Sequence, residues 1–320
     1  MWQAVIIIVV CFVLLTWSAD IFVDAAVVIA DYCHVPKVII GTVLVGFATA
    51  FPELLVSFDA ALHGAQGIAI GNALGSYIIN IALVLGVTAL IQPIHVSRGL
   101  LRQEIPVMGL ALIIASSVLY DGYLSQGDGL LLLVMLALVV MGFVIYVMRH
   151  IAQIKKNIPV KVTIKYTPTR ACVYLLFMLL VMLSSARFLT SAAVDLAHFL
   201  GVSDLMIGLT IVAVGTSLPE LAASIAGVKK GEDDIAIGNV IGSNILGLLG
   251  VLAMPALFSP GDLSPMIWYR DCAFMAGLTL LFWVACVYFD KGVLRINRIE
   301  GLLGVALYGV YIWLLVLFPG

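Results

Sequence analysis

Two glutamates, Glu53 and Glu220, lie in strongly apolar stretches of the chain, each directly after a proline. A carboxylate in the middle of a membrane costs about 2.5–3.5 kcal/mol on insertion scales. Two such groups beside helix-breaking prolines predict a cation-binding site within the membrane. Thr49 and Thr216 stand four residues before the glutamates, one helical turn away on the same face, so each threonine oxygen can share a ligand with its carboxylate.

The chain carries this pattern twice, because residues of the first copy recur at one offset of 167 residues, as from Glu53 to Glu220. The other matching pairs are Gly41 and Gly208, Thr49 and Thr216, Pro52 and Pro219, Leu54 and Leu221, and Ser57 and Ser224. A second motif, Ile68–Ser76, recurs at the same offset as Ile235–Ser243. This duplication predicts two structural repeats with a shared site between them.

The prolines and glycines of the two motifs predict local geometry. Each proline removes one backbone donor, so we expect carbonyl oxygens about a turn earlier to face a cavity. These carbonyls belong to residues near Ala48 and Gly215, and as far back as Gly46 and Ala213. The glycines of the second motif are spaced for close helix packing, Gly71 with Gly75 and Gly238 with Gly242. Such packing brings Ser76, Asn80 and Ser243 toward the same centre.

The composition defines the class of protein. Of the 320 residues, 63% are hydrophobic and only 11% are charged, which excludes a soluble fold. The first apolar run lacks a basic leader and a cleavage site, so we interpret it as a retained span. The five cysteines are scattered without a C-x-x-C pair, as expected of small buried hydrophobic residues. The apolar stretches contain no motif of an intramembrane protease, so we do not expect an enzyme.

Hydrophobic stretches of about 20 residues predict an all-α membrane protein with ten transmembrane helices. Their approximate limits are 4–30, 37–62, 67–92, 104–120, 127–148, 171–198, 205–228, 234–258, 266–288 and 300–318. Basic residues gather in the loops after the first, third, fifth, seventh and ninth stretches, which places those loops in the cytoplasm and both termini outside.

Each half then contains five spans, an odd number, so the second half enters the membrane from the side opposite to the first. We therefore predict two inverted five-helix repeats, residues 1–148 and 171–320, joined by a basic cytoplasmic linker, residues 149–170. Inverted repeats place a binding site near the membrane midplane and permit alternating access.

The donor types predict which ions bind. Two carboxylates with hydroxyl, amide and carbonyl oxygens suit Ca²⁺, which takes about six to eight oxygen ligands, and disfavour soft metals. Calcium cancels both charges, whereas several sodium ions cancel them only as a group. One site therefore holds either calcium or sodium, which is a physical basis for exchange. Protonation of the carboxylates in a dry site is also favourable, so a proton-coupled antiporter is the alternative.

The motifs resemble those of the calcium/cation antiporter superfamily over essentially the whole chain. The residues that carry the resemblance are Thr216-Ser217-Leu218-Pro219-Glu220, Gly238-Asn239 and Gly242-Ser243-Asn244, together with the duplicated layout. Within the superfamily the Thr-x-x-Pro-Glu form is similar to sodium/calcium exchangers, particularly the small bacterial inner-membrane calcium/sodium antiporters.

The resemblance implies roles for individual residues. Glu53 and Glu220 would bind calcium, with further oxygens from Thr49 and Thr216. Ser76, Ser217, Ser243 and Asn80, with the backbone near Gly46 and Ala213, would complete flanking sodium sites. Three positions depart from the family pattern, because Ala50 replaces the usual Ser, Tyr77 the usual Asn, and Gly247 the usual Asn or Asp.

The expected partners are the transported Ca²⁺ and Na⁺, with H⁺ as the alternative coupling ion, and the lipid bilayer. We expect no cofactor, no nucleic acid and no requirement for an oligomer. The resemblance places the protein in a bacterial inner membrane.

Overall fold

The computed structural model describes residues 2–97, 100, 103–154, 167–200, 213–288 and 295–318. Gly208, the first part of the predicted span 205–228 and most of the predicted linker 149–170 lie outside the described residues.

The first half is a series of helices that, in the described residues, includes two short π-helical segments, named η1 and η2. Its elements are α1 (Trp2–Cys33), α2 (Lys37–Ile39), η1 (Ile40–Val45), α3 (Gly46–Thr49), α4 (Phe51–Leu62), α5 (Gln66–Ile79), η2 (Asn80–Val84), α6 (Leu85–Ile91), α8 (Glu104–Val118) and α9 (Gln126–Ile154). The two-residue strands β1 (Ile94–His95) and β2 (Tyr123–Leu124) lie in the loops on either side of α8.

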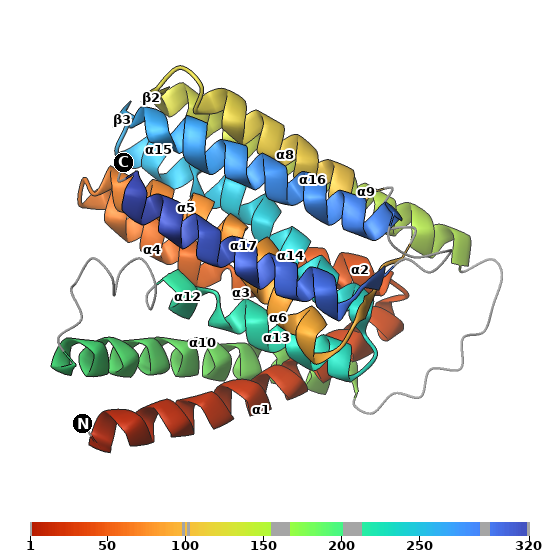
Figure 1. Ribbon diagram of the computed structural model, residues 1–320. Coiled ribbons are helices and arrows are strands. Elements are labelled where there is room, and N and C mark those ends of the chain that lie inside the picture. Colours follow the sequence, from red (N-terminus) through yellow and green to blue (C-terminus); the bar gives the residue numbers. More distant parts are fainter. Residues whose placement is uncertain are drawn as a thin grey trace.

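The second half repeats much of this order. Its elements are α10 (Pro168–Phe199), α12 (Ala213–Thr216), α13 (Leu218–Lys229), α14 (Asp233–Leu246), η4 (Gly247–Val251), α15 (Ala253–Phe258), β3 (Gly261–Asp262), η5 (Ile267–Cys272), α16 (Ala273–Tyr288), β4 (Arg295–Ile296) and α17 (Arg298–Leu317). The strands pair antiparallel between the halves, β1 with β4 and β2 with β3. Figure 1 shows both termini at the same end of the helix bundle.

The repeat is visible in the elements themselves. Helices α3, α4 and α5 have the same lengths as α12, α13 and α14, and each begins 167 residues before its counterpart, as Phe51 does before Leu218. The π-helical segments η2 and η4 begin at Asn80 and Gly247, again at this offset. Because π-helical turns are rare and gather at functional sites, their recurrence marks equivalent places in the two halves.

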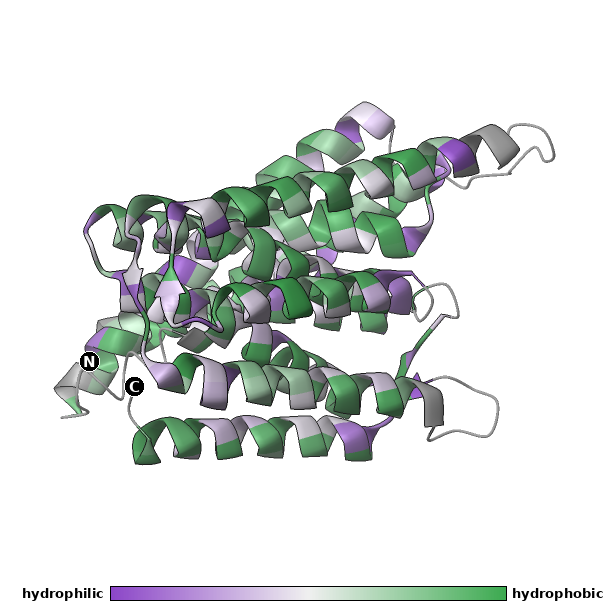
Figure 2. Cartoon of the chain, turned by 90° about the horizontal axis from the view of Figure 1, so that it is seen from above, coloured by the Kyte–Doolittle hydropathy of each residue, from purple (hydrophilic) through white to green (hydrophobic). Residues whose placement is uncertain are grey.

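The length and composition of the helices support a polytopic membrane protein. Seven helices among the described residues qualify as membrane spans, or eight if the bent pair Lys37–Thr49 and Phe51–Leu62 is one span. Helix α8, with 15 residues, is apolar but shorter. Figure 2 shows hydrophobic residues along most of the outer helices and hydrophilic residues gathered toward the helix ends. The count of ten spans stays a prediction.

The prolines interrupt the helices where the sequence predicts it. Ala50 precedes α4 and Ser217 precedes α13, and both have φ and ψ near the bridge region, −82° and 6° for Ala50 and −91° and 8° for Ser217. Pro52 and Pro219 then occupy the first turn of the new helix, where a missing N–H leaves no donor unpaired within the helix. The bend between the two parts of the first broken helix is 41°.

Helices α1 and α10 form a separate pair beside the rest of the bundle. They pack along each other's length, and Leu15, Phe22 and Met182 belong to a hydrophobic cluster distinct from the main core. The main core surrounds α5, η2, α14 and η4. Figure 1 shows the pair along one side of the molecule.

Ion pairs join this helix pair and the repeats at one end. The Lys230 ammonium lies 2.8 Å from both Asp20 and Asp24 of α1, and Lys37 lies 2.7 Å from Glu232. Lys230 directly follows α13, so its ion pairs tie α1 to the second repeat.

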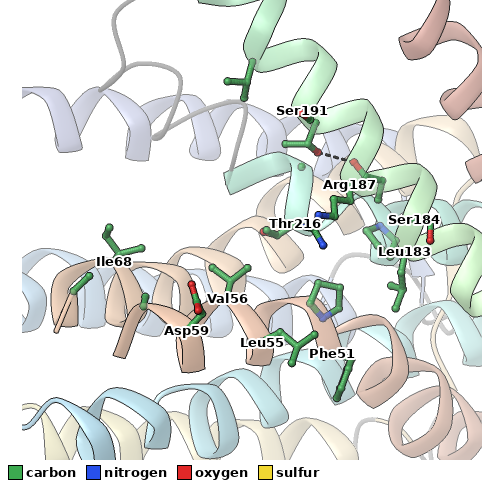
Figure 3. A pocket seen from close by; sticks show the side chains of 18 of the residues that line it. Phe51, Leu55, Val56, Asp59, Ile68, Leu183, Ser184, Arg187, Ser191 and Thr216 are labelled. Atoms are coloured by element: carbon green, nitrogen blue, oxygen red, sulfur yellow. Dashed lines mark hydrogen bonds between the residues drawn. The ribbon is translucent and has the colours of Figure 1, made fainter. Parts of the chain in front are cut away.

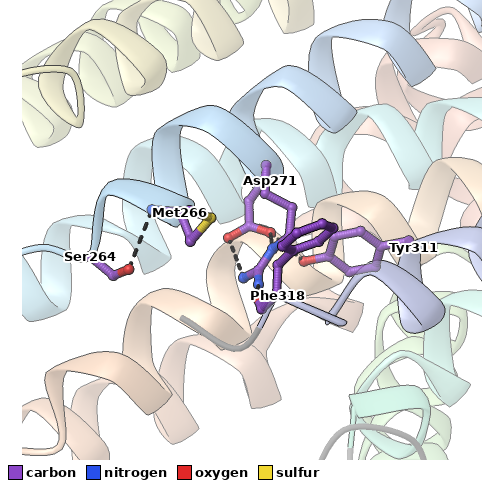
Figure 4. Close-up of polar contacts among 6 residues, drawn as sticks. Ser264, Met266, Asp271, Tyr311 and Phe318 are labelled. Carbon is purple, nitrogen blue, oxygen red and sulfur yellow. Dashed lines mark hydrogen bonds and ion pairs between the residues drawn. The ribbon is translucent and has the colours of Figure 1, made fainter. Parts of the chain in front are cut away.

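A different polar cluster connects η5 with the end of α17. Asp271 accepts hydrogen bonds from Arg270 at 2.8 and 3.0 Å and from the Tyr311 hydroxyl at 3.0 Å. Arg270 also donates to the carbonyl oxygen of Phe318 (Figure 4). These bonds satisfy the buried carboxylate of Asp271 at an apolar helix junction.

Close glycine packing occurs in the second copy of the motif. A Cβ on Gly238 would lie 2.6 Å from the carbonyl oxygen of Val38 and 2.9 Å from the amide nitrogen of Thr42. Gly242 meets the backbone of Thr42 even more closely. The prediction for Gly71 and Gly75 is wrong in this structure, because a Cβ on either would meet no atom within 4 Å. Helix α14 therefore packs against α2 and η1, backbone to backbone, across the two repeats.

Substitution of Gly238 by Ala tests this packing. The added methyl group overlaps backbone atoms that cannot rotate away, so we expect a loss of about 1–3 kcal/mol in the free energy of unfolding. Thermal unfolding in detergent measures the effect. The control is Gly142→Ala on α9, an exposed glycine whose Cβ meets nothing within 4 Å, and we expect an unchanged or slightly higher melting temperature. Equal melting temperatures of Gly238→Ala and Gly142→Ala would contradict the close backbone packing at Gly238.

Candidate functional site

Glu53 and Glu220 meet in the interior, each in the first turn of a helix that starts at a break. Glu53 is in α4 and Glu220 in α13, and their exposed fractions are 2% and 0%. The two carboxylates lie close enough for their charges to repel each other. The partial positive charge of each helix N-terminus favours an acidic side chain at this position, which offsets part of the repulsion.

Most of the carboxylate oxygens have no hydrogen-bond partner among the described residues. Both side-chain oxygens of Glu53 and Oε2 of Glu220 are buried without a hydrogen bond. Among the described residues only Oε1 of Glu220 has a donor, the Ser243 hydroxyl at 3.4 Å, whose single hydrogen is shared with the carbonyl oxygen of Gly46 at 3.0 Å. No lysine or arginine among the described residues forms an ion pair with either glutamate. Buried charges without partners are strongly unfavourable, so the site requires cations or protons.

Neutral oxygens from both halves surround the carboxylates. The Thr49 hydroxyl donates to Oδ1 of Asn239 at 2.9 Å and lies 3.4 Å from the Ser243 hydroxyl. Ser243 donates to the carbonyl oxygen of Gly46 at 3.0 Å. The Ser217 hydroxyl is buried without a hydrogen bond and lies near Glu53. The carbonyl of Gly46 thus faces the cluster, as the proline argument predicts.

The other candidates lie further from this cluster. Asn80 begins η2 and donates to Oδ1 of Asn244 at 3.1 Å, while its own Oδ1 is buried without a partner. Ser76 is buried one turn earlier, on the same face of α5 as Asn80. Thr216 is half-buried and lines a cavity. The structure therefore brings Glu53, Glu220, Thr49, Ser217 and Ser243 together.

Two asparagines of the second motif support the site although we did not place them among the ligands. Asn239 donates from Nδ2 to the carbonyl oxygen of Glu220 at 3.0 Å and to the Ser224 hydroxyl at 3.0 Å. Asn72 makes the same two contacts in the first half, with Glu53 and Ser57, both at 2.9 Å. Asn72 and Asn239 occupy equivalent positions in the repeated motif, and this equivalence could have identified them as site residues from the sequence.

The three departures from the family pattern have distinct surroundings. Ala50 is the residue at the helix break and is buried. The Tyr77 hydroxyl lies 2.6 Å from the Thr279 hydroxyl of α16, so its polar atom bonds to a neighbouring helix. Gly247 has room for a side chain, since its Cβ would meet only the carbonyl oxygen of Ala73, at 3.8 Å.

A cavity of about 1010 Å³ lies beside the helix breaks that precede the two glutamates. Residues of α4, α10, α12 and α13 line it, among them Pro52, Thr216 and Pro219, which adjoin the site in sequence. Figure 3 shows Arg187 and Thr216 facing the same space between α10 and α4.

The donor set fits hard cations. No group of three or more His, Cys, Asp and Glu side chains suited to a metal occurs in the part of the chain that the structure describes. The site instead offers two carboxylates with hydroxyl, amide and carbonyl oxygens, which suit Ca²⁺ and Na⁺.

Comparisons with known proteins agree with this chemistry. The sequence model of the family described as sodium/calcium exchanger protein matches residues 3–149 and 170–317. The inner membrane protein YrbG of Escherichia coli is 40% identical over 288 residues, which cover 88% of each protein. The putative antiporter CaxA of Alkalimonas amylolytica is 40% identical and covers 93% of this chain, which in turn covers 94% of CaxA.

A solved structure shows the same fold. The sodium-calcium exchanger NCX_Mj, soaked with Na⁺ and Sr²⁺, superposes with a TM-score of 0.81 at 32% identity, and the match covers 97% of each chain.

The bond between Thr49 and Asn239 can be tested by a double-mutant cycle. Asn239→Ala leaves buried groups of Thr49, Ser224 and Glu220 unpaired, and Thr49→Val leaves Oδ1 of Asn239 unpaired. Each unpaired buried group costs about 1–3 kcal/mol. We expect the double variant to lose about 1 kcal/mol less free energy of unfolding than the sum of the single variants. Chemical denaturation in detergent measures all four proteins, and additive losses would argue against the bond.

Proposed function

This chain belongs to the sodium/calcium exchanger protein family, and on that premise we propose that it exchanges Ca²⁺ for Na⁺ across the membrane by alternating access. Its relatives are transporters, so the protein is an integral membrane antiporter and not an enzyme. The coupling ion, the ligands and the access mechanism are the parts that we propose.

The observation that carries the proposal is the pair of buried carboxylates with three unpaired oxygens. A divalent cation between Glu53 and Glu220 cancels both charges at once. Thr49 and Thr216 supply further oxygens to calcium, and Ser217 has a buried hydroxyl with no other partner.

Sodium occupies the same region in the alternative loaded state. Two or more Na⁺ ions also neutralise the carboxylates, with oxygens of Ser76, Ser243 and Asn80 and the carbonyl of Gly46 as flanking ligands. The unpaired Oδ1 of Asn80 and the clustered hydroxyls around Gly46 support this assignment. Because each glutamate is shared, calcium and the full set of sodium ions exclude one another.

Ten spans in two inverted repeats complete the proposal. The family model matches the chain in two parts, residues 3–149 and 170–317, close to the repeats predicted at 1–148 and 171–320. The equal helix lengths at an offset of 167 residues, as from Glu53 to Glu220, and the location of both termini at one end of the bundle support it further. Rearrangement of two such halves opens the shared site to either side in turn.

We place the protein in the bacterial inner membrane with both termini outside the cytoplasm. The name of the Escherichia coli relative and the distribution of basic residues support this location. Transport of this kind needs the lipid bilayer and the two ions, without a cofactor, nucleic acid or oligomer.

Proton coupling is the second candidate. Protons neutralise the same carboxylates without further oxygens, and the polar atom of Tyr77 is engaged by Thr279 instead of facing an ion. The glutamates have fewer polar side chains around them than in the family pattern. We expect this to weaken sodium binding more than proton binding, because a proton needs no further oxygen ligands.

Calcium uptake by everted membrane vesicles distinguishes the two coupling ions. With a sodium gradient imposed at constant pH, we expect calcium flux that collapses when the gradient is removed. With a pH gradient and no sodium, we expect little flux. Vesicles from cells without the protein give the background. Calcium flux that depends on the pH gradient and is unchanged by the sodium gradient would establish the proton-coupled alternative.

Replacement of one carboxylate tests the site itself. Glu53→Gln and Glu220→Gln each remove one of the two charges that calcium cancels, so we expect calcium exchange to fall to background while the protein still inserts and folds. The control is Glu104→Gln, because Glu104 is fully buried at the start of α8 with two unpaired oxygens but lies outside the site. Exchange should continue in this control; normal exchange in either site variant would reject the assignment.

A further inference from the structure

Arg187 places a positive charge in the cavity that adjoins the candidate site. It lies on α10, is exposed, and lines the cavity of about 1010 Å³ together with Thr216 and Pro219. Figure 3 shows its side chain extending from α10 toward Thr216.

No partner neutralises this charge within the described residues. Neither an ion pair nor a side-chain hydrogen bond joins Arg187 to another residue of that part of the chain. The acidic residue among those that line the cavity is Asp59, which lies 3.6 Å from Nδ1 of His63. A guanidinium group stays charged at all physiological pH values, so the charge of Arg187 acts on whatever enters.

We propose that cations reach the site through this cavity and that the charge of Arg187 raises the half-saturating concentration of calcium more than that of sodium on the side to which the cavity opens. The proposal rests on the exchange of Ca²⁺ and Na⁺ at the glutamates. The electrostatic energy of an ion scales with its charge, so one positive potential acts twice as strongly on Ca²⁺ as on each Na⁺.

The expected size of the effect follows from Coulomb's law. A unit charge about 10 Å away in water changes the binding constant of a monovalent cation about twofold and that of a divalent cation about fourfold. Apolar cavity walls strengthen the field, while salt screens it over about 8 Å at physiological ionic strength. The fold-change for calcium should therefore be the square of the fold-change for sodium. A residue that acts only through packing has no reason to obey this relation.

The proposal is tested by measuring the half-saturating concentrations of Ca²⁺ and Na⁺. These are measured in purified protein, and in proteoliposomes with ions added on the cavity side. For Arg187→Gln we expect the value for calcium to fall about fourfold and that for sodium about twofold. Arg187→Lys keeps the charge and should resemble the wild type. Arg187→Glu reverses the charge and should move both values further in the same direction. High ionic strength should reduce all of these differences.

The matched control is Arg149→Gln, the same substitution at an exposed arginine near the end of α9, outside the cavity lining. It should leave both half-saturating concentrations unchanged. Equal fold-changes for the two ions in Arg187→Gln, no change at all, or an Arg187→Lys variant that behaves like Arg187→Gln would overturn the proposal.

The same measurements on the wild-type protein distinguish an error in the proposed exchange function from an error in the proposal about Arg187. If the wild-type protein binds calcium but sodium does not compete, sodium coupling is wrong. The proposal about Arg187 is then decided by calcium alone, which must bind more tightly in Arg187→Gln and normally in Arg187→Lys. A wild-type protein that binds neither ion would overturn both proposals.

Discussion

Two like charges buried beside each other are the constraint on which the rest of the structure depends. Glu53 and Glu220 have three unpaired oxygens between them, and the surrounding helices are too apolar to stabilise the charges. The protein supplies only partial compensation through two helix N-termini and the Ser243 hydroxyl. The remaining stabilisation has to come from bound cations or protons.

The helix breaks, asparagines and glycines all serve this arrangement. The breaks at Ala50 and Ser217 start new helices directly before the carboxylates. Asn72 and Asn239 bind the backbone carbonyls of the glutamates and fix the first turn of each helix. Gly238 lets α14 contact the first repeat closely enough for residues of one half to bond to those of the other.

Much of the site could be predicted from the sequence because duplication identifies equivalent residues. The apolar surroundings of Glu53 and Glu220 and the adjacent prolines predicted that the carboxylates would meet at helix breaks. Duplication does not reveal which copy makes a given contact. Gly238 packs against another backbone while its counterpart Gly71 does not, and Asn239 bonds to Thr49 across the repeats. Such differences depend on the packing of the halves, which periodicity and spacing do not determine.

The helix breaks also show where the two halves have diverged. Ser217 has a hydroxyl beside the carboxylates, whereas Ala50 at the equivalent break has none. Asn80 begins one π-helical segment with a buried amide, and Gly247 begins the other without a side chain. A fused gene can accumulate such differences because each copy mutates alone, whereas identical subunits in a dimer must change together. The proposed ligand shell is therefore asymmetric, and an exchanger built this way need not run at the same speed in its forward and reverse directions.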